Sequence, residues 1–256
     1  MRDLSVTPIQ CELQWEQPED NRRTIGQLIS ALDKPGDLIV LPEMFTTGFS
    51  MNALSNAEEP GGPTYEWLVD IARQQDCAIC GSIAVSSNHG VYNRMLFATP
   101  NGIEHYDKRH LFRMAGEDKR YLAGSERVIV SWREWRINLQ ICYDLRFPVF
   151  SRNREDYDLI VYVANWPEAR RLHWRALLIA RAIENQACVV GVNRIGEDAR
   201  GQSYSGDSLV VAADGTLLAD AQNENGAPQV TLDGAALLKY RQDFPCALDA
   251  DSFQLD

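Results

Sequence analysis

The hydrophobic positions of this chain form short apolar runs separated by amphipathic stretches. Two of the runs, DLIVLPEMF from Asp37 and DLIVYVANW from Asp158, share their first four residues. Each is followed by a stretch with hydrophobic residues at helical spacing, and then by two further apolar runs of strand length. The pattern therefore predicts two similar βαββ units, placed one after the other along the chain.

The spacing predicts the helices and strands of both units and one helix before them. The expected helices cover residues 21–32, 64–75 and 172–185, and the expected strands cover residues 78–85, 91–99, 188–195 and 207–212. Asn101-Gly102 and Asp214-Gly215 are hairpin turn signals, because both dipeptides readily adopt positive φ angles. Such units favour an α/β fold in which two mixed sheets face each other. No Gly-, Ser- or Pro-rich linker divides the chain, so a single domain spanning residues 1–256 is expected.

Composition and charge narrow the classes of function. The chain has 256 residues, of which 45% are hydrophobic and 24% are charged, as in an ordinary globular protein. Its formal net charge of −11 argues against nucleic acid as a partner, because phosphate binding needs a basic face. No apolar run approaches the length that spans a bilayer, and the N-terminus carries no export signal. We therefore expect a cytoplasmic protein with neither a membrane nor a nucleic acid partner.

Six cysteines in a chain without an export signal are expected to be reduced. Cys77 and Cys80 form a C-x-x-C pair, which raises the alternative of a metal or redox site. The segment CAICGSIAV has the pattern of a buried strand, in which residues three apart point to opposite faces. No second pair completes a zinc site in the sequence. A structural role is therefore favoured for both cysteines, and no metal is expected.

Three other residues combine the side chains that nucleophilic acyl transfer requires. Glu43 and Cys142 each follow directly on an apolar run, and Lys108 lies in the segment YDKRHLF. A carboxylate can act as base, a thiol as the attacking atom and an ammonium as the partner of an oxyanion. Open α/β sheets present their chemistry at such strand ends. Aligning the two DLIV runs puts Ala164 opposite Glu43, so the carboxylate is an addition to the repeated scaffold.

Each of the three residues also has an ordinary structural interpretation. Glu43 could be a solvated loop carboxylate, although the apolar residues around it argue for partial burial. Lys108, taken by itself, would belong to a solvated turn. Cys142 could be an inert core thiol, but the polar and aromatic turn YDLRFP that follows it favours exposure of the sulfur. A sharp turn there would also aim the backbone N–H of Tyr143 at a substrate carbonyl oxygen.

The segments around these three residues resemble the Glu, Lys and Cys motifs of the nitrilase, or carbon-nitrogen hydrolase, superfamily. NWPEARRLHWRALLIARAIENQ resembles the corresponding segment of its omega-amidase branch, and the likeness runs from the strand near Ser5 to RQDFP near the end. The resemblance implies a four-layer α-β-β-α sandwich with a pseudo-twofold βαββ repeat, and a homodimer. Thiol, acid and ammonium together cover the chemistry, so no cofactor is expected.

The resemblance also assigns roles. It makes Cys142 the nucleophile, Glu43 its base and Lys108 the residue that stabilises the tetrahedral oxyanion. Glu117, in MAGEDKRY, resembles the second glutamate of the superfamily, which holds the lysine and helps position the substrate amide. Asp118 is adjacent, and a slip of one residue would exchange the two acids.

Several residues are candidates for substrate binding. Tyr143 would contribute its backbone N–H. Arg146 follows the nucleophile by four residues and could bind a carboxylate at the far end of the substrate, or act only as a structural clamp. Phe49 and Trp166, together with Phe45, could wall a small pocket, although aromatic residues at strand ends often belong to the core.

The alternative catalytic arrangement is a cysteine hydrolase in which a histidine serves as the base, since Cys-His is a common pairing. The sequence shows no recognisable orienting partner for any histidine, and the fold pattern does not suit a papain-like enzyme. The four histidines are His89, His105, His110 and His173.

We therefore expect an omega-amidase that hydrolyses the terminal amide of small dicarboxylic acid monoamides. The resemblance implies 2-oxoglutaramate and 2-oxosuccinamate as its type substrates. The nearest alternatives are superfamily hydrolases that act on a nitrile, an N-carbamoyl amine or a modified tripeptide. A thiol redox or binding protein that merely keeps the scaffold is a further alternative, but the presence of all three catalytic side chains argues against it.

Overall fold

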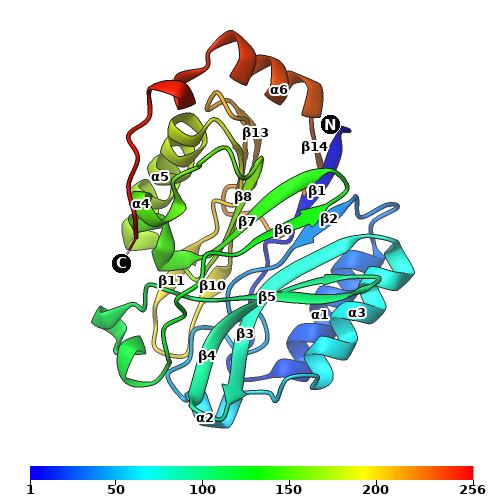
Figure 1. Cartoon of the computed structure of the whole chain (residues 1–256). Helices are drawn as coiled ribbons and strands as arrows, with labels where there is room; N and C mark the ends of the chain where they lie inside the picture. The colour runs from blue at the N-terminus through cyan, green and yellow to red at the C-terminus, as the bar shows by residue number, and fades with distance from the viewer. Residues whose placement is uncertain (256) are drawn as a thin grey trace.

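Two mixed sheets pack face to face, and helices cover their outer surfaces (Figure 1). The computed structural model describes residues 1–255, so that Asp256, the last residue of the expected domain, lies outside the described residues. Within them, each of the two sheets has six strands, in the orders β14-β1-β2-β3-β4-β5 and β13-β12-β9-β8-β7-β6. The predicted four-layer α-β-β-α sandwich is confirmed.

The first sheet combines strands from the first half of the chain with one strand near its end, whereas the strands of the second sheet all come from residues 129–220. The first sheet contains β1 (Leu4–Pro8), β2 (Leu38–Val40), β3 (Ala78–Ser87), β4 (Gly90–Thr99), β5 (Gly102–Asp107) and β14 (Val230–Leu232). The second contains β6 (Ile129–Trp132), β7 (Trp135–Ile141), β8 (Leu159–Ala164), β9 (Cys188–Asn193), β12 (Leu209–Val211) and β13 (Leu217–Asp220). A small third sheet pairs β10 (Ile195–Glu197) with β11 (Ser203–Ser205).

The helices lie on opposite sides of the molecule (Figure 1). Helices α1 and α3 cover the first sheet, and α5 covers the second. The α-helices are α1 (Pro18–Ser30), α2 (Ala53–Asn56), α3 (Pro63–Gln75), α4 (Pro148–Ser151), α5 (Arg171–Asn185) and α6 (Gly234–Asp243). Short 3-10 turns are η1 (Arg113–Ala115), η2 (Glu117–Lys119), η3 (Cys142–Arg146), η4 (Glu168–Arg170) and η5 (Cys246–Asp249).

The repeated DLIV runs form equivalent strands of the two sheets. Strand β2 pairs in parallel with β3, and Leu38 lies opposite Ala78. Strand β8 pairs in the same way with β9, and Leu159 lies opposite Cys188. In both sheets an antiparallel strand then follows, β4 in the first and β12 in the second. The pseudo-twofold repeat of βαββ units predicted from the sequence is therefore confirmed.

Successive side chains along each strand point to opposite faces of the sheet. The apolar residues are therefore divided into three layers, one between the sheets and one under the helices on each side. Val40 of β2 and Val161 of β8 pack in the core between the sheets. Their neighbours Ile39 and Ile160 face the helix layers instead. The same alternation places Cys80 and Cys77 in different clusters, one between the sheets and one under the helices. This separation agrees with the structural role predicted for the C-x-x-C pair.

Some element boundaries differ from the sequence expectation. The first helix begins at Pro18, whose fixed φ suits the first turn, and ends at Ser30, so that Leu32 lies beyond it. The expected strand 188–195 is interrupted after Asn193, since β10 pairs instead with β11. The two hairpin turns form where expected, with Gly102 and Gly215 at positive φ.

Candidate active site

Three strand ends bring Glu43, Lys108 and Cys142 together. Glu43 lies just beyond β2 and Lys108 just beyond β5, both in the first sheet, whereas Cys142 follows β7 of the second sheet. The Lys108 Nζ atom donates to Glu43 Oε1 at 2.8 Å. The Cys142 thiol interacts electrostatically with the same carboxylate, which raises the pKa of the thiol. The site is therefore shared between the two halves of the sandwich.

Glu43 is fully buried and is not a solvated loop carboxylate. Besides Lys108, the side-chain amide of Asn93 donates to Oε1 at 2.8 Å. The other carboxylate oxygen, Oε2, accepts from the backbone N–H of Asn165 at 2.8 Å. These donors fix the carboxylate in one orientation beside the sulfur. Geometry of this kind suits a residue that must exchange a proton with Cys142.

Lys108 is also completely buried, which its basic-polar sequence context does not indicate. Its ammonium contacts both oxygens of Glu117 at 3.0 Å and lies 5.1 Å from the centre of the Phe49 ring. Burial by itself disfavours the charged form, but Glu117 and Glu43 outweigh it and raise the pKa of Lys108 above its ordinary value. The residue is therefore a permanent cation inside the site.

Glu117, and not Asp118, is the acid that faces the lysine. Its Oε2 atom also accepts from the backbone N–H of Phe112 at 2.6 Å. Burial raises the pKa of the Glu117 carboxyl, Lys108 opposes this shift and Glu43 adds to it. Asp118 turns away and forms an ion pair with Arg113 at 2.8 Å. Of the two acids that the sequence left open, Glu117 is therefore the one beside Lys108.

Cys142 occupies a strained turn and is partly open to the pocket. Its φ of 45° lies in the left-handed region, which is unfavourable for a residue with a side chain. The residue ends β7 and begins η3, as the predicted sharp turn requires. Burial, followed by the Glu43 charge, raises the pKa of the thiol well above its ordinary value, against the opposing effect of Lys108. The resting sulfur is therefore protonated and needs a base before it can attack.

The remaining cysteines differ from Cys142. Cys11, Cys77, Cys80 and Cys188 are buried, and burial raises the pKa of each thiol, to about 12 for Cys11, Cys77 and Cys188. Cys246 is partly exposed, near the end of the chain and away from the pocket. All six are unpaired. Among the described residues, no group of three or more His, Cys, Asp or Glu side chains is arranged to hold a metal ion.

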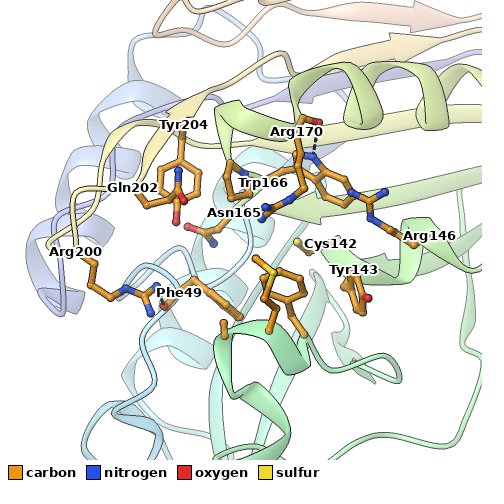
Figure 2. A pocket seen from close by; sticks show the side chains of 14 residues that line it. Phe49, Cys142, Tyr143, Arg146, Asn165, Trp166, Arg170, Arg200, Gln202 and Tyr204 are labelled. Carbon is orange, nitrogen blue, oxygen red and sulfur yellow. Dashed lines mark hydrogen bonds between the residues drawn. The ribbon is translucent and has the colours of Figure 1, made fainter.

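A pocket of about 250 Å³ opens above Cys142 (Figure 2). The expected residues Phe49, Tyr143, Arg146 and Trp166 all line it. Phe45 does not, because it is buried in the core with its ring 5.9 Å from that of Trp67. Residues that the sequence interpretation missed complete the wall: Phe112, Met114, Ala115, Asn165, Pro167, Arg170, Arg200, Gln202 and Tyr204.

Three arginines line this pocket, and they differ in how they are held. The guanidinium of Arg146 lies 4.8 Å from the Trp166 ring centre, and its Nη2 contacts His173 Nδ1 at 2.9 Å. Arg200 donates to the backbone oxygen of Phe49 at 3.0 Å. Arg170 lies over the Phe112 ring at 5.4 Å. Figure 2 shows the Arg170 side chain directed into the pocket toward Cys142.

His110 has an orienting partner, Asp144, which the sequence did not reveal. The expectation that no histidine has such a partner was therefore wrong. His110 Nδ1 lies 2.7 Å from Asp144 Oδ1, and the imidazole ring stacks on Phe147 with the ring centres 3.9 Å apart. The ring does not line the pocket, and the nearby charges that shift the pKa of the Cys142 thiol are those of Glu43, Lys108 and Glu117. The thiol is therefore paired with a carboxylate and not with a histidine.

A family model for carbon-nitrogen hydrolases matches residues 5–242. The chain belongs to the carbon-nitrogen hydrolase family. It is 48% identical to the omega-amidase YafV of Escherichia coli over the whole of both chains. It is 33% identical to the 2-oxoglutaramate amidase of Bacillus subtilis, covering 94% of this chain and 95% of that protein.

The fold is shared with solved members of the same superfamily. The structure of XC1258 from Xanthomonas campestris, a CN-hydrolase superfamily protein with an arsenic adduct in its active site, superposes with a TM-score of 0.98. The two chains are 46% identical and cover each other completely. The family and the fold inferred from the sequence motifs are therefore confirmed.

Proposed function

We propose that this protein is an omega-amidase that hydrolyses the terminal amide of small dicarboxylic acid monoamides, with 2-oxoglutaramate and 2-oxosuccinamate as type substrates. The observation that carries the proposal is a pocket that contains the Cys142 thiol and three guanidinium groups, with the thiol under the influence of a buried carboxylate that binds a buried ammonium. The names of the relatives, omega-amidase and 2-oxoglutaramate amidase, support the same activity.

In the first half of the reaction, Glu43 takes the proton of the Cys142 thiol while the sulfur attacks the amide carbon. The carbonyl electron pair moves to the oxygen, and the oxyanion is stabilised by the Lys108 ammonium and the backbone N–H of Tyr143. The C–N bond then breaks as Glu43 returns the proton to the nitrogen. Ammonia leaves, and a thioester on Cys142 remains.

In the second half, water attacks the thioester and Glu43 accepts its proton. The second oxyanion forms in the same place and collapses with cleavage of the C–S bond, and the proton passes to the sulfur. Glu43 thus serves as base, acid and base again. Glu117 keeps Lys108 in place and helps to position the substrate amide. Thiol, carboxyl and ammonium supply every step, so the proposal includes no metal or organic cofactor.

The guanidinium groups of the pocket would bind the carboxylate at the other end of the substrate. Arg146 is the residue chosen from the sequence, but it already stacks on Trp166 and contacts His173. Arg170 stacks on Phe112 and points into the cavity (Figure 2). We propose that Arg170 and Arg146 together hold the carboxylate, between walls formed by Phe49 and Trp166.

The experiment that tests this function is ammonia release from a panel of substrates. Succinamate and 2-oxoglutaramate should be hydrolysed far faster than propionamide, an aliphatic nitrile or an N-carbamoyl amine. Equal rates on succinamate and propionamide would contradict an omega-amidase and favour a general amidase of the same family. Absence of turnover on every compound would favour the alternative of a binding or redox protein.

The proposal also includes a cytoplasmic location and a homodimer. Six unpaired cysteines fit a reducing compartment. Among the described residues, every helix is too short or too polar to cross a membrane. Trp174 of α5 is buried within the subunit and donates to the backbone oxygen of Asp207. The exposed apolar residues Leu172 and Ile183 of α5 could contribute to the interface, which light scattering after gel filtration would test.

A further inference from the structure

Asp144 joins the turn that carries Cys142 to the loop that carries Lys108. Its carboxylate is fully buried. Oδ2 accepts from the backbone N–H of Ile141, directly before the nucleophile, at 2.9 Å and from the hydroxyl of Tyr106 at 2.8 Å. Oδ1 accepts from the backbone N–H of His110 at 3.0 Å and contacts its Nδ1 at 2.7 Å. One carboxylate therefore contacts both segments.

The contacts from the lysine loop fall on both sides of Lys108. Tyr106 precedes it by two residues and ends in a hydroxyl that also accepts from the backbone N–H of Arg109 at 3.1 Å. His110 follows Lys108 by two residues and is further held by its stack on Phe147, within the nucleophile's own segment. Burial, and next the Asp144 charge, raise the pKa of Tyr106 well above its ordinary value, so the hydroxyl remains a donor.

This connection matters because the two segments belong to different sheets. Lys108 follows β5 of the first sheet, and Cys142 follows β7 of the second. Between the sheets lies an apolar core, and apolar contacts are not directional. They hold the layers together without setting the relative position of two side chains to a fraction of an ångström. Hydrogen bonds, whose lengths and angles are narrowly defined, can set it.

We propose that Asp144, with Tyr106 and His110 as its partners, is a positioning group that fixes the Cys142 sulfur relative to the Lys108 ammonium and Glu43. The inference rests on the proposed function for the roles of these three residues. It predicts that weakening the group lowers the rate of the chemical step more than it weakens substrate binding. The reason is that the carboxylate end of the substrate binds elsewhere in the pocket.

The test uses two buried tyrosines whose hydroxyls each donate a hydrogen bond. Tyr106→Phe removes the hydroxyl that binds Asp144. Tyr157→Phe is the matched control, because its buried hydroxyl donates to the backbone oxygen of Ser151 at 2.6 Å, away from the lysine loop. Tyr106→Phe should lower kcat for succinamate about tenfold with little change in KM, since a misplacement of about 1 Å can cost 10²-fold in rate. Tyr157→Phe should keep the wild-type kcat.

Melting temperatures of the two variants separate positioning from general loss of stability. The melting temperature of Tyr106→Phe should fall further, because this variant loses a bond to a carboxylate and a bond from the Arg109 N–H, whereas Tyr157→Phe loses one bond to a neutral carbonyl. The values of kcat are therefore compared at a temperature at which both variants are fully folded. Asp144→Asn is a second variant, which places an amide group against several donors and should lower kcat further. Equal losses of kcat in Tyr106→Phe and Tyr157→Phe, or a wild-type kcat in Tyr106→Phe, would overturn the inference.

The rate of Cys142 alkylation by iodoacetamide provides a measurement that does not depend on the substrate. It should fall in Tyr106→Phe, because the sulfur is displaced from its base, and should be unchanged in Tyr157→Phe. If the wild-type protein hydrolysed no omega-amide, the proposed function would fail while this comparison still decided the positioning role. If omega-amides were hydrolysed but Tyr106→Phe changed neither the alkylation rate nor kcat, only the positioning role would fail.

Discussion

Asn165 binds Glu43 twice, once through its main chain and once through its side chain. The backbone N–H donates to Glu43 Oε2 at 2.8 Å, and the side-chain amide donates to the Glu43 backbone oxygen at 2.6 Å. Glu43 aligns with Ala164 in the repeated runs, so Asn165 follows the equivalent strand end of the other sheet. The two strand ends of the pseudo-twofold repeat therefore meet in the active site.

Asn165→Ala should impair both stability and turnover. The variant leaves the buried Glu43 carbonyl without its donor, which costs about 1–3 kcal/mol of unfolding free energy. It also loosens the carboxylate that must exchange protons with Cys142, so kcat should fall. Urea unfolding and succinamate hydrolysis would measure the two effects. A variant with wild-type kcat and stability would show that the main-chain bond alone holds Glu43.

Cys142→Ala should abolish hydrolysis while the fold persists, because no other thiol lies in the pocket. Iodoacetamide should modify Cys142 ahead of the buried cysteines, because those thiols are shielded from solvent, whereas Cys142 lines the pocket and has Glu43 beside it as a base. Peptide mapping by mass spectrometry after limited labelling would identify the site. Faster labelling of Cys77 or Cys80 would refute the assignment of the nucleophile.

Lys108→Ala should lose about 10²–10³-fold in kcat, the usual effect of removing one donor to an oxyanion. The change also leaves Glu43 and Glu117 buried without their shared cation, so the variant should be less stable as well. Lys119→Ala is the control, because Lys119 is exposed and lies outside the pocket. Circular dichroism should first establish that the Lys108 variant is folded. A folded variant with near-normal turnover would show that Lys108 does not stabilise the oxyanion.

Arg170→Ala and Arg146→Ala should each erode the preference for substrates that carry a carboxylate. Losing the partner of a desolvated carboxylate costs about 2–5 kcal/mol, so kcat/KM for succinamate should fall while that for propionamide changes little. Arg171→Ala is the matched control, because that neighbouring arginine pairs with Asp207 outside the pocket. An unchanged preference in both variants would place the carboxylate elsewhere, with Arg200 as the remaining guanidinium.

Asp158, the first residue of the second repeat, gives a prediction about acid stability. Burial alone would raise its pKa, but hydrogen bonds from Arg136 and Arg241 outweigh it and lower the pKa. The stabilisation is therefore present above the unfolded pKa of about 3.9 and is lost as the pH falls through the lower folded value. Asp158→Asn should be less stable than wild type in urea at neutral pH. The gap should close in acid.

The control for that measurement is Asp70→Asn, since Asp70 is exposed on α3. Its unfolding free energy should match that of wild type at both pH values. A gap between Asp158→Asn and wild type that stayed constant down to acid would assign the effect to packing, not to charge.

The sequence predicted the parts of the site that follow from strand ends. Glu43 and Cys142 stand directly after apolar runs. Because these runs form strands of the two sheets, the ends of the strands determine where both residues lie. The burial of Lys108 could not be predicted, because it depends on Glu117 and Asn93 brought from other elements. Asn165 was missed although a signal existed, since it follows the residue that aligns with Glu43. Arg170 and Arg200 carry no periodic signal and enter the pocket only through the tertiary arrangement.

The division of the site between two sheets also bears on how activity arises during folding. The bonds that complete the site join residues far apart in sequence, Glu43 with Asn165 and Tyr106 with Asp144. Contacts with such long separations form late, because the intervening chain must first lose its conformational freedom. A refolding chain that has built either sheet alone holds no catalytic set. Recovered turnover therefore reports the docking of the two halves, which circular dichroism of secondary structure would not distinguish from their separate formation.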